Sequence, residues 1–288
     1  MRYSRVVVVL SGGGAKAAAH LGALKALAEW KLTAGHYVGT SMGAVIAAGF
    51  AAGVTYEEML VRIGRVSRGD VARLAPLSLI WPFASALLRV APLRETIGRL
   101  VPARRFGELG VPLTVTATDI ESGKLVLFGA GGADAPLIDA LYASCALPVL
   151  YPPGTIAGRR YADGGIHAVL PLDVAAQFDP DLIYAVNVGP TLGPEPQGES
   201  MLPGMVRAHD SVTRIMMAAQ IAATIERWRG ASTPLVLVEP EVVQGTFGVG
   251  NAFAHVEAGY RAACGELARW AEAGRTGKGE RGTGNGEG

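Results

Sequence analysis

The chain has 288 residues, of which 50% are hydrophobic and 18% are charged. This composition excludes a disordered chain, because disorder requires low hydrophobicity and high net charge. The formal net charge of +1 argues against a nucleic-acid partner, since phosphate binding needs a basic excess. The two cysteines, Cys145 and Cys264, are too few for a disulfide framework and lack metal-ligand spacing, so we expect neither disulfides nor a metal or other cofactor.

The first fifty residues alternate between strands and helices. Val6–Leu10 is a mostly β-branched run, which predicts a buried parallel strand. A glycine turn at Ser11–Gly14 leads into a predicted helix at Ala15–Trp30. The short strand His36–Val38, another glycine turn and a small-residue helix at Ala44–Ala52 repeat this order. Such alternation predicts an α/β fold with a parallel sheet.

The rest of the chain continues in the same way. Residues 55–101 predict helices punctuated by prolines. Further strands are predicted at Val111–Ala117, Lys124–Phe128, Arg159–Tyr161, Leu182–Val188 and Leu235–Val238, and helices at Leu137–Cys145, Met205–Arg229 and Phe253–Ala273. The sequence shows no repeat and no linker, so we expect one domain over residues 1–274. The glycine-rich residues 275–288 predict a disordered tail.

The amino end does not predict a secretory signal, because the apolar run Val6–Leu10 is short and meets three glycines at once. The most apolar long window is Pro76–Leu93, but prolines and Arg89 interrupt it, so it is too short to span a membrane. We therefore expect a cytoplasmic protein that is soluble or peripherally membrane-associated. Trp81 and Phe83 favour a cover near the site that dips into a lipid interface, and the alternative is a helical pair packed on the core.

The strongest motif is Gly39-Thr40-Ser41-Met42-Gly43, a G-x-S-x-G pattern between a predicted strand and a predicted helix. Such a turn raises the serine above the sheet, and Gly39 and Gly43 permit the tight turn and leave room for substrate. The amino end of the following helix favours a developing negative charge at the serine. Ser41 is therefore the candidate nucleophile. The alternative is an ordinary turn in which the serine caps the helix.

A second glycine turn is Gly12-Gly13-Gly14-Ala15-Lys16-Ala17. Its backbone N–H groups are suited to hold an anion, which would be a phosphate or the oxyanion of an acyl-transfer intermediate. Gly12, Gly14 and Ala17 fit the dinucleotide fingerprint, but that fingerprint needs an acidic residue after the second strand, where Ser41 and its neighbours stand. The nucleotide-binding interpretation is kept as an alternative.

The third motif is Asp163-Gly164-Gly165, directly after a short predicted strand. A carboxylate at hydrogen-bond distance is able to remove the proton of a nucleophilic serine, whereas the alternative is a turn aspartate. Ser41 and Asp163 both follow predicted strands, so the carboxyl edge of a parallel sheet would bring them to one crevice. A triad using His209 or His255 is also open, but both histidines fall in predicted helices and the serine turn comes early for an α/β-hydrolase.

Two further polar residues are interpreted as structural. Asp119 precedes the turn that ends at Gly123, and we expect it to accept hydrogen bonds from the N–H groups of that turn. His20 is expected to pack behind the first glycine turn. Arg104 and Arg105 are expected to lie in a solvated loop, with contact to lipid headgroups as the alternative.

Four sequence blocks in this order resemble the bacterial patatin-like phospholipase family. They are GGGAKAAAHLG at Gly12–Gly22, the turn GTSMG, the stretch Gly110–Gly123 followed by Ala143–Pro153, and YADGG at Tyr161–Gly165. The resemblance extends from residue 5 to about residue 190. Lys16 stands where the family usually has arginine, Ala17 where it usually has glycine, and the asparagine often found after the last block is absent.

The resemblance implies a three-layer α/β/α fold with a mainly parallel sheet. It also implies a Ser–Asp dyad without histidine, with Ser41 as nucleophile, Asp163 as general base and Gly12, Gly13 and Gly14 as the oxyanion hole. Lys16, Gly39, Gly43, Gly164 and Gly165 would support these motifs. The family cleaves acyl esters of lipids and phospholipids without a metal. The expected function is thus a phospholipase A, lysophospholipase or esterase, and the alternative is a nucleotide-binding or catalytically inactive patatin-like regulatory protein.

Overall fold

The computed structural model describes residues 3–75, 86–192, 204–242 and 249–279. Within them, the centre of the molecule is an eight-stranded sheet in the order β5-β6-β3-β2-β1-β7-β8, with β4 also paired to β3. The strands are β1 Val6–Leu10, β2 His36–Thr40, β3 Leu113–Asp119, β4 Leu125–Gly129, β5 Gly154–Ile156, β6 Arg159–Asp163, β7 Leu182–Val186 and β8 Leu235–Val238. Strands β3, β2, β1, β7 and β8 are parallel, whereas β4 and β6 pair antiparallel with β3, and β5 with β6.

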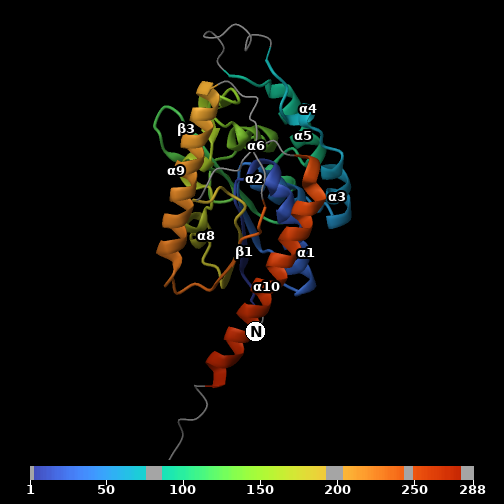
Figure 1. The fold of residues 1–288 in the computed structure, drawn as a ribbon, viewed down its shortest axis with the longest axis vertical. Coiled ribbons are helices and arrows are strands. Elements are labelled where there is room, and N and C mark those ends of the chain that lie inside the picture. Colours follow the sequence, from blue (N-terminus) through green and yellow to red (C-terminus); the bar gives the residue numbers. More distant parts are fainter. Residues whose placement is uncertain (1–2, 76–85, 193–203, 243–248, 280–288) are drawn as a thin grey trace, which may run out of the picture.

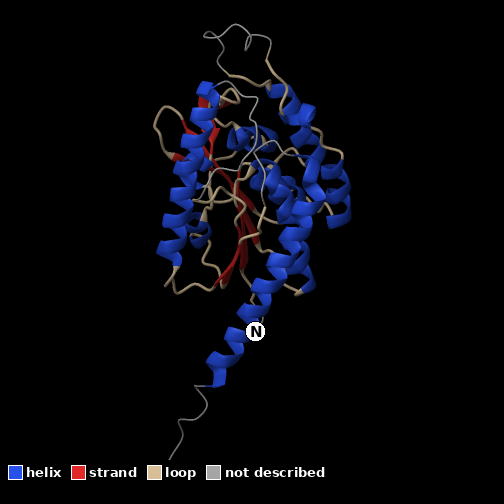
Figure 2. Cartoon of the chain, in the orientation of Figure 1, coloured by secondary structure: helices blue, strands red, loops and turns tan. Residues whose placement is uncertain are grey.

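Helices cover both faces of this sheet, which confirms the three-layer α/β/α arrangement (Figures 1 and 2). One face packs on α1, α2, α5, α6 and α10, and the other packs on α8 and α9. The α-helices are α1 Ala19–Glu29, α2 Met42–Ala51, α3 Tyr56–Gly64, α4 Arg68–Val71, α5 Val90–Leu100, α6 Leu137–Cys145, α7 Gly165–Ala168, α8 Leu172–Ala176, α9 Gly204–Trp228 and α10 Ala252–Gly279. The 3-10 turns are η1 Gly14–Ala18, η3 Phe106–Glu108 and η4 Val249–Asn251.

Strand β1 shows how the sheet divides the core. Every residue of Val6–Leu10 is buried, because a central parallel strand is covered on both faces. Side chains alternate between the faces, so Val6, Val8 and Leu10 join the larger hydrophobic cluster, and Val7 and Val9 join the smaller one. The continuous apolar run in the sequence therefore reflects burial on two sides.

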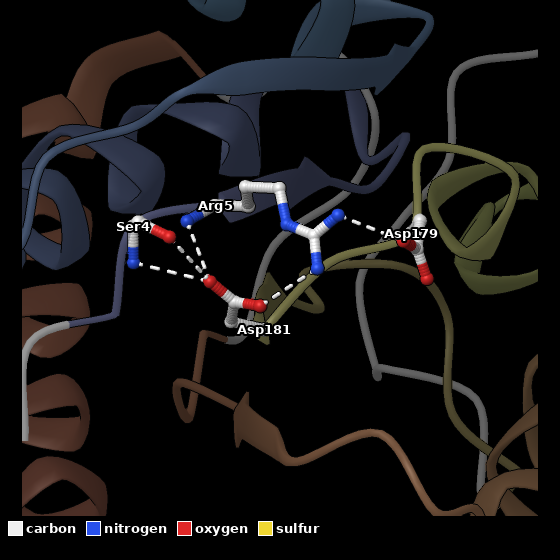
Figure 3. A network of polar contacts seen from close by, with 4 residues as sticks. All are labelled: Ser4, Arg5, Asp179 and Asp181. Atoms are coloured by element: carbon white, nitrogen blue, oxygen red, sulfur yellow. Dashed lines mark hydrogen bonds and ion pairs between the residues drawn. The ribbon is translucent and has the colours of Figure 1, made fainter.

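Exposed polar contacts join β1 to β7 at the amino-terminal edge of the sheet (Figure 3). Asp181 Oδ2 accepts hydrogen bonds from the backbone N–H groups of Ser4 at 3.2 Å and Arg5 at 3.1 Å, and from the Ser4 hydroxyl at 2.8 Å. The Arg5 guanidinium pairs with Asp181 at 3.0 Å and with Asp179 at 2.7 Å. The Ser4 hydroxyl and the guanidinium lower the pKa of Asp181 to about 2. This network fixes the start of both strands.

The predicted elements agree with the structure in order, and several differ in their bounds. Strands β1 and β8 and helix α6 have the predicted bounds. The predicted helix Ala15–Trp30 is corrected, because it begins as the 3-10 turn η1 and becomes α-helical only from Ala19. Gly14 has φ of +58°, which belongs to a tight turn and not to a helix interior. Strand β5 was not predicted, since three residues are too few to show an alternating pattern.

The carboxyl-terminal helix is longer than predicted. Helix α10 continues to Gly279, past the point where the sequence predicted the disordered tail to begin at residue 275. Helix propagation adds one hydrogen bond for each residue fixed, so a long helix is able to continue through isolated glycines. Residues 280–288 of the predicted tail lie outside the described residues.

The apolar window Pro76–Leu93 is described only from residue 86. Trp81 and Phe83 lie outside the described residues. Leu87 and Leu88 are buried, and their N–H groups donate to the carbonyls of residues 149 and 150, so this end of the window packs on the core. Residues 55–75 contain the helices α3 and α4, and α4 has only four residues. This segment is therefore less helical than the sequence predicted. In the described part of the chain, no helix has the length and apolarity needed to cross a bilayer.

Candidate active site

Ser41 occupies a strained turn between β2 and α2. Its φ of +54° lies in the left-handed region, and such a conformation costs about 1–3 kcal/mol at a non-glycine residue. A Cβ atom at Gly39 would lie 2.4 Å from the Cα of Ala44, and one at Gly43 would lie 2.3 Å from the carbonyl oxygen of Ser11. Both positions therefore require glycine. The G-x-S-x-G pattern is explained by this close approach of backbones around the serine.

The Ser41 hydroxyl points at a buried carboxylate. Its Oγ donates to Asp163 Oδ2 at 2.8 Å, and the other carboxylate oxygen, Oδ1, accepts the N–H of Gly165 at 2.7 Å. Asp163 is only 4% exposed. Burial raises the pKa of Asp163 to about 6, against the smaller lowering effects of the Gly165 N–H and the Ser41 hydroxyl. The pair thus combines a serine hydroxyl with a carboxylate that is more basic than an ordinary aspartate.

The two side chains meet for a different topological reason from the one predicted. The sequence placed both at the carboxyl ends of parallel strands, but β6 runs antiparallel to β3. Thr40, the last residue of β2, pairs with Thr116 of β3, and Asp163 pairs with the next residue, Ala117. Strand β6 therefore ends beside β3 at the level where Ser41 leaves β2. The expected proximity is confirmed, whereas the parallel arrangement of β6 was wrong.

The last turn of α6 holds both members of the pair. The buried Ser144 hydroxyl accepts the backbone N–H of Ser41 at 2.8 Å. Backbone carbonyls of the same turn accept the N–H of Asp163, at Ala146 with 3.0 Å, and the N–H of Gly164, at Ser144 with 3.3 Å. Sequence reasoning quoted Ser144 within a motif block but gave it no role. Its position in that block, four residues before Pro148, was the available signal.

The first glycine turn lies beside Ser41 at Gly12. The N–H of Gly12 is already donated to the carbonyl of Val169 at 3.0 Å, and a Cβ atom at Gly12 would lie 3.4 Å from the Cβ of Ser41. Among the described residues, the N–H groups of Gly13 and Gly14 have no hydrogen-bond acceptor. Of the three glycines expected to form an oxyanion hole, Gly12 therefore has its N–H engaged elsewhere, and Gly13 and Gly14 remain candidates; Gly12 leaves space beside Ser41.

A half-buried cation, Lys16, belongs to the same turn. Lys16 Nζ donates to the carbonyl of Gly189 at 3.1 Å, and burial lowers the pKa of Lys16. His255 of α10 is 4% exposed, and burial lowers its pKa, which the carbonyl of Ala15 opposes and the charge of Lys16 reinforces. His255 therefore contacts the glycine turn through the backbone carbonyl of Ala15. The Asp163 carboxylate accepts hydrogen bonds from the Ser41 hydroxyl and the Gly165 N–H, and none from His255.

The other residues considered in the sequence have structural surroundings. His20 is fully buried behind the glycine turn, with Nε2 3.0 Å from the carbonyl oxygen of Ser11, as expected. Asp119 Oδ1 accepts two backbone N–H groups of the following turn at 2.9 Å each, also as expected. His209 lies on α9 and approaches Thr213 at 3.4 Å. In the described residues, no three His, Cys, Asp or Glu side chains are grouped to hold a metal ion.

A family model described as "Patatin-like phospholipase" matches residues 8–176, which is more than half of the chain. The matched region includes the glycine turn, Ser41, Ser144 and Asp163. The chain belongs to the patatin-like phospholipase family. The resemblance inferred from the sequence blocks is therefore confirmed.

Individual relatives cover parts of this patatin-like chain. An uncharacterised NTE family protein of Mycobacterium tuberculosis is 34% identical over 196 residues, which are 68% of this chain and 52% of that relative. The chain thus spans about half the length of this relative. Patatin-like phospholipase domain-containing protein 7 of Mus musculus is 28% identical over 185 residues, covering 64% of this chain and 14% of the relative. The crystal structure of VipD from Legionella pneumophila aligns with a TM-score of 0.46 at 16% identity, covering 93% of this chain and 67% of VipD.

Four strands and α-helices lie beyond the region matched by the patatin-like family model, namely β7, α9, β8 and α10. Strand β7 pairs with β1, and β8 extends the sheet beside β7. Helix α10 packs along α1 and contacts η1 in the glycine turn, and α9 contacts α7, the short helix that follows Asp163. Helices α9 and α10 therefore border the candidate site.

Proposed function

We propose that this patatin-like protein is a serine lipid acyl hydrolase that uses Ser41 and Asp163 as a dyad. The observation that carries the proposal is the 2.8 Å hydrogen bond from the Ser41 hydroxyl to a buried carboxylate. A nucleophilic serine needs a base within hydrogen-bond reach, and Asp163 meets that requirement directly. Membership of the patatin-like phospholipase family supports lipid esters as the substrates.

In the first half-reaction, ionised Asp163 accepts the proton of Ser41 as Oγ attacks the ester carbonyl. The carbonyl oxygen becomes an oxyanion, which the N–H groups of Gly13 and Gly14 would stabilise. The amino end of α2 lies at Ser41 and favours the same negative charge. Collapse of the tetrahedral intermediate breaks the ester bond, and Asp163 gives its proton to the leaving alcohol. The acyl group remains on Ser41.

In the second half-reaction, Asp163 acts as a base again. It removes a proton from a water molecule that attacks the acyl-serine, and it returns the proton to Ser41 Oγ as the carboxylic acid leaves. One ester and one water thus give one acid and one alcohol, and both protein groups return to their initial states. A pKa near 6 suits this double role, because the carboxyl group both accepts and donates a proton near neutral pH.

The proposal is tested first by covalent labelling. A fluorophosphonate probe should label the native protein at Ser41, and Ser41→Ala should abolish labelling. Ser122 is an exposed serine in a turn, and the variant Ser122→Ala is the control. The probe should label this variant as it labels the native protein. Labelling at another residue, or no labelling of a folded native protein, would count against an active serine hydrolase and favour an inactive patatin-like scaffold.

A lipid panel then defines the type of hydrolase. Diacyl phospholipids, lysophospholipids and short-chain esters should be compared with the native protein and with Ser41→Ala and Asp163→Asn. Loss of either member of a catalytic unit should lower turnover about 10³-fold or more. Hydrolysis of phospholipids over soluble esters would identify a phospholipase, and the reverse would identify a general esterase. Turnover retained by Asp163→Asn would refute the dyad.

A further inference from the structure

Helix α9 is apolar on its outer face as well as on its inner face. From residue 208 to residue 223, every fully exposed side chain is apolar, namely Ala208, Val212, Ile215, Met216, Ala219, Ala222 and Ala223. The inner face packs on the sheet through buried Ile221 and partly buried Met217, Ile225 and Trp228. A surface helix of a soluble protein normally carries charged and polar residues on its outer face. We call these seven exposed residues the apolar stripe.

The stripe has the spacing of a single helix face. Its members recur at intervals of three and four residues, so they lie one above another along the helix. The three largest side chains are strongly exposed, with 55% for Val212, 51% for Ile215 and 67% for Met216. Asp210 and Arg214 lie on this stretch of α9 but are only half-exposed, and strongly exposed charged residues occur at Arg207 and from Glu226 onward. Because the outer face between them carries no strongly exposed charge, an acidic or basic partner is a poor match.

The stripe is joined to the candidate active site. Gln220 of α9 accepts the N–H of Val169 at 2.8 Å and donates to the carbonyl of Ile166 at 3.1 Å. Ile166 lies in α7 and Val169 directly follows it, and α7 begins directly after Asp163 and Gly164. Ile166 is itself 41% exposed, so a further exposed apolar side chain stands on the short helix that joins α9 to the candidate carboxylate. In Figure 1, α9 forms an outer edge of the molecule, away from α1, α3 and α10.

The size of the stripe argues against a second copy of this chain as its occupant. Sixteen residues of helix are about 24 Å long, and one helix is about 10 Å wide, so the stripe covers about 240 Å². A stable protein–protein interface buries about 800 Å² on each partner. A lipid surface has no such requirement, since an interfacial helix binds by inserting an apolar face among the headgroups.

We propose that the apolar stripe of α9 docks on the surface of a zwitterionic lipid bilayer and brings the candidate active site against it. The functional role of this docking rests on the proposed lipid hydrolase function, but vesicle binding itself does not require turnover. The larger side chains Val212, Ile215 and Met216 insert into the headgroup region. The surface that binds lipid is then continuous with the surface through which an ester reaches Ser41.

The test is sedimentation of the protein with phosphatidylcholine vesicles. The variants are Ile215→Gln and Met216→Gln, singly and together, and glutamine preserves helix propensity while removing apolar surface. Vesicle partitioning should fall at least about tenfold for the double variant, in proportion to the apolar area lost. The matched control is Val61→Gln, which removes a 53% exposed apolar side chain from α3 on the opposite side of the molecule. Val61→Gln should bind as the native protein does, and circular dichroism confirms that each variant is folded.

Four outcomes would overturn the proposal. Three concern vesicles: a native protein that does not bind them, a double variant that binds as well as the native protein, and a control that loses as much binding as the double variant. The fourth is a native dimer in solution that Ile215→Gln and Met216→Gln dissociate, which would assign the stripe to a second copy. Ser41→Ala should bind vesicles normally. If the native protein hydrolyses no ester and the stripe variants still lose binding, the proposed function fails and the docking surface stands.

Discussion

Asp163 is a residue at which stability and reactivity oppose each other. Its carboxylate is almost fully buried, and burial raises its pKa from 3.8 to about 6. Folding therefore favours the protonated form, so the stability that this protonation contributes is fully present below pH 3.8 and is lost as pH rises through about 6. At neutral pH the folded protein holds a buried charge that the unfolded chain would solvate.

The first prediction is that Asp163→Asn stabilises the protein at high pH. Asparagine is neutral at every pH and keeps an oxygen for the Gly165 N–H. The free energy of unfolding should rise relative to the native protein by at most about 3 kcal/mol above pH 7, and the difference should vanish near pH 4. Urea unfolding at the two pH values measures this. If the variant were equally stable or less stable than the native protein at high pH, the buried charge of Asp163 would not destabilise the folded protein.

The second prediction concerns the pH dependence of the reaction. The proposed base must be ionised, so kcat/KM for a soluble ester should rise through a pKa of about 6 and level off above it. His209→Ala and His255→Ala should keep this rise in kcat/KM near pH 6 and a substantial part of the rate, because neither histidine hydrogen-bonds Asp163. Steady-state rates between about pH 4.5 and pH 8.5 provide the measurement. If the rise in kcat/KM near pH 6 disappeared in one histidine variant, a triad would replace the dyad.

The third prediction assigns Ser144 a positioning role. Ser144→Ala leaves the N–H of the strained Ser41 without its acceptor, and an unsatisfied buried donor costs about 1–3 kcal/mol. We expect kcat to fall about tenfold or more with little change in KM, because the substrate contacts remain while the nucleophile loses its fixed position. The control is Ser122→Ala, an exposed serine outside the site. A rise in KM with unchanged kcat would instead place Ser144 in substrate binding.

At the scale of elements, the contact between α1 and α10 depends on two glycines. A Cβ atom at Gly22 would lie 1.8 Å from the carbonyl oxygen of Val256, and one at Gly259 would lie 1.9 Å from that of Ala19. The two helix backbones therefore approach too closely for any side chain. This close packing places His255, one turn before Gly259, against the carbonyl of Ala15 in the glycine turn.

The fourth prediction follows from this contact. Gly22→Ala and Gly259→Ala should each lower the free energy of unfolding by about 1–3 kcal/mol or more, because the helices must separate. Gly265→Ala is the matched control in α10, where a Cβ atom would meet nothing within 4 Å. It should stabilise the protein by up to about 1 kcal/mol through helix propensity. Thermal or urea unfolding compares the three variants, and a destabilised Gly265→Ala would contradict the explanation by packing.

The sequence predicted elements best where the pattern is local. The β-branched run of β1 and the apolar run of β8 identify buried strands without reference to the rest of the chain. The ends of strands were predicted wrongly where pairing with a distant strand determines them. Strand β6 continues to Asp163 because its last residues pair with β3, and β2 continues to Thr40 because Thr40 bonds to Thr116. These pairings join residues far apart in the sequence, so no local window reveals them.

The candidate site shows the same division. Ser41 and Asp163 could be selected from sequence, because each lies in a glycine-containing motif after a strand. The role of Ser144 could not, since it is separated from Ser41 by 103 positions and acts only because α6 ends beside the serine turn. The use of the Gly12 N–H by Val169 was equally hidden, because that contact depends on the segment that follows α7. Motifs thus predicted which two side chains form the candidate pair, and packing determines which groups position them.

At the scale of the whole molecule, the elements beyond the family match complete the sheet and the core. Strand β8 pairs in parallel with β7 from Leu235 to Val238, and β7 in turn pairs with β1, whose end leads into the glycine turn. Ala263 and Leu267 of α10 are buried in the same cluster as α1 and α2. Within the described residues, one core therefore extends across the matched and unmatched parts of the chain.

The fifth prediction is that the chain folds as one cooperative unit that requires β8 and α10. A chain ending at Arg229 would expose the edge of β7 and the face of α1 around Gly22, and would lose the buried side chains of α10. An exposed apolar strand edge also favours aggregation. We expect the full chain to unfold in a single transition that circular dichroism and tryptophan fluorescence report at the same urea concentration. The shortened chain should show no cooperative transition, and a soluble fragment that unfolds cooperatively and binds the fluorophosphonate probe would establish that the last two elements are dispensable for the fold.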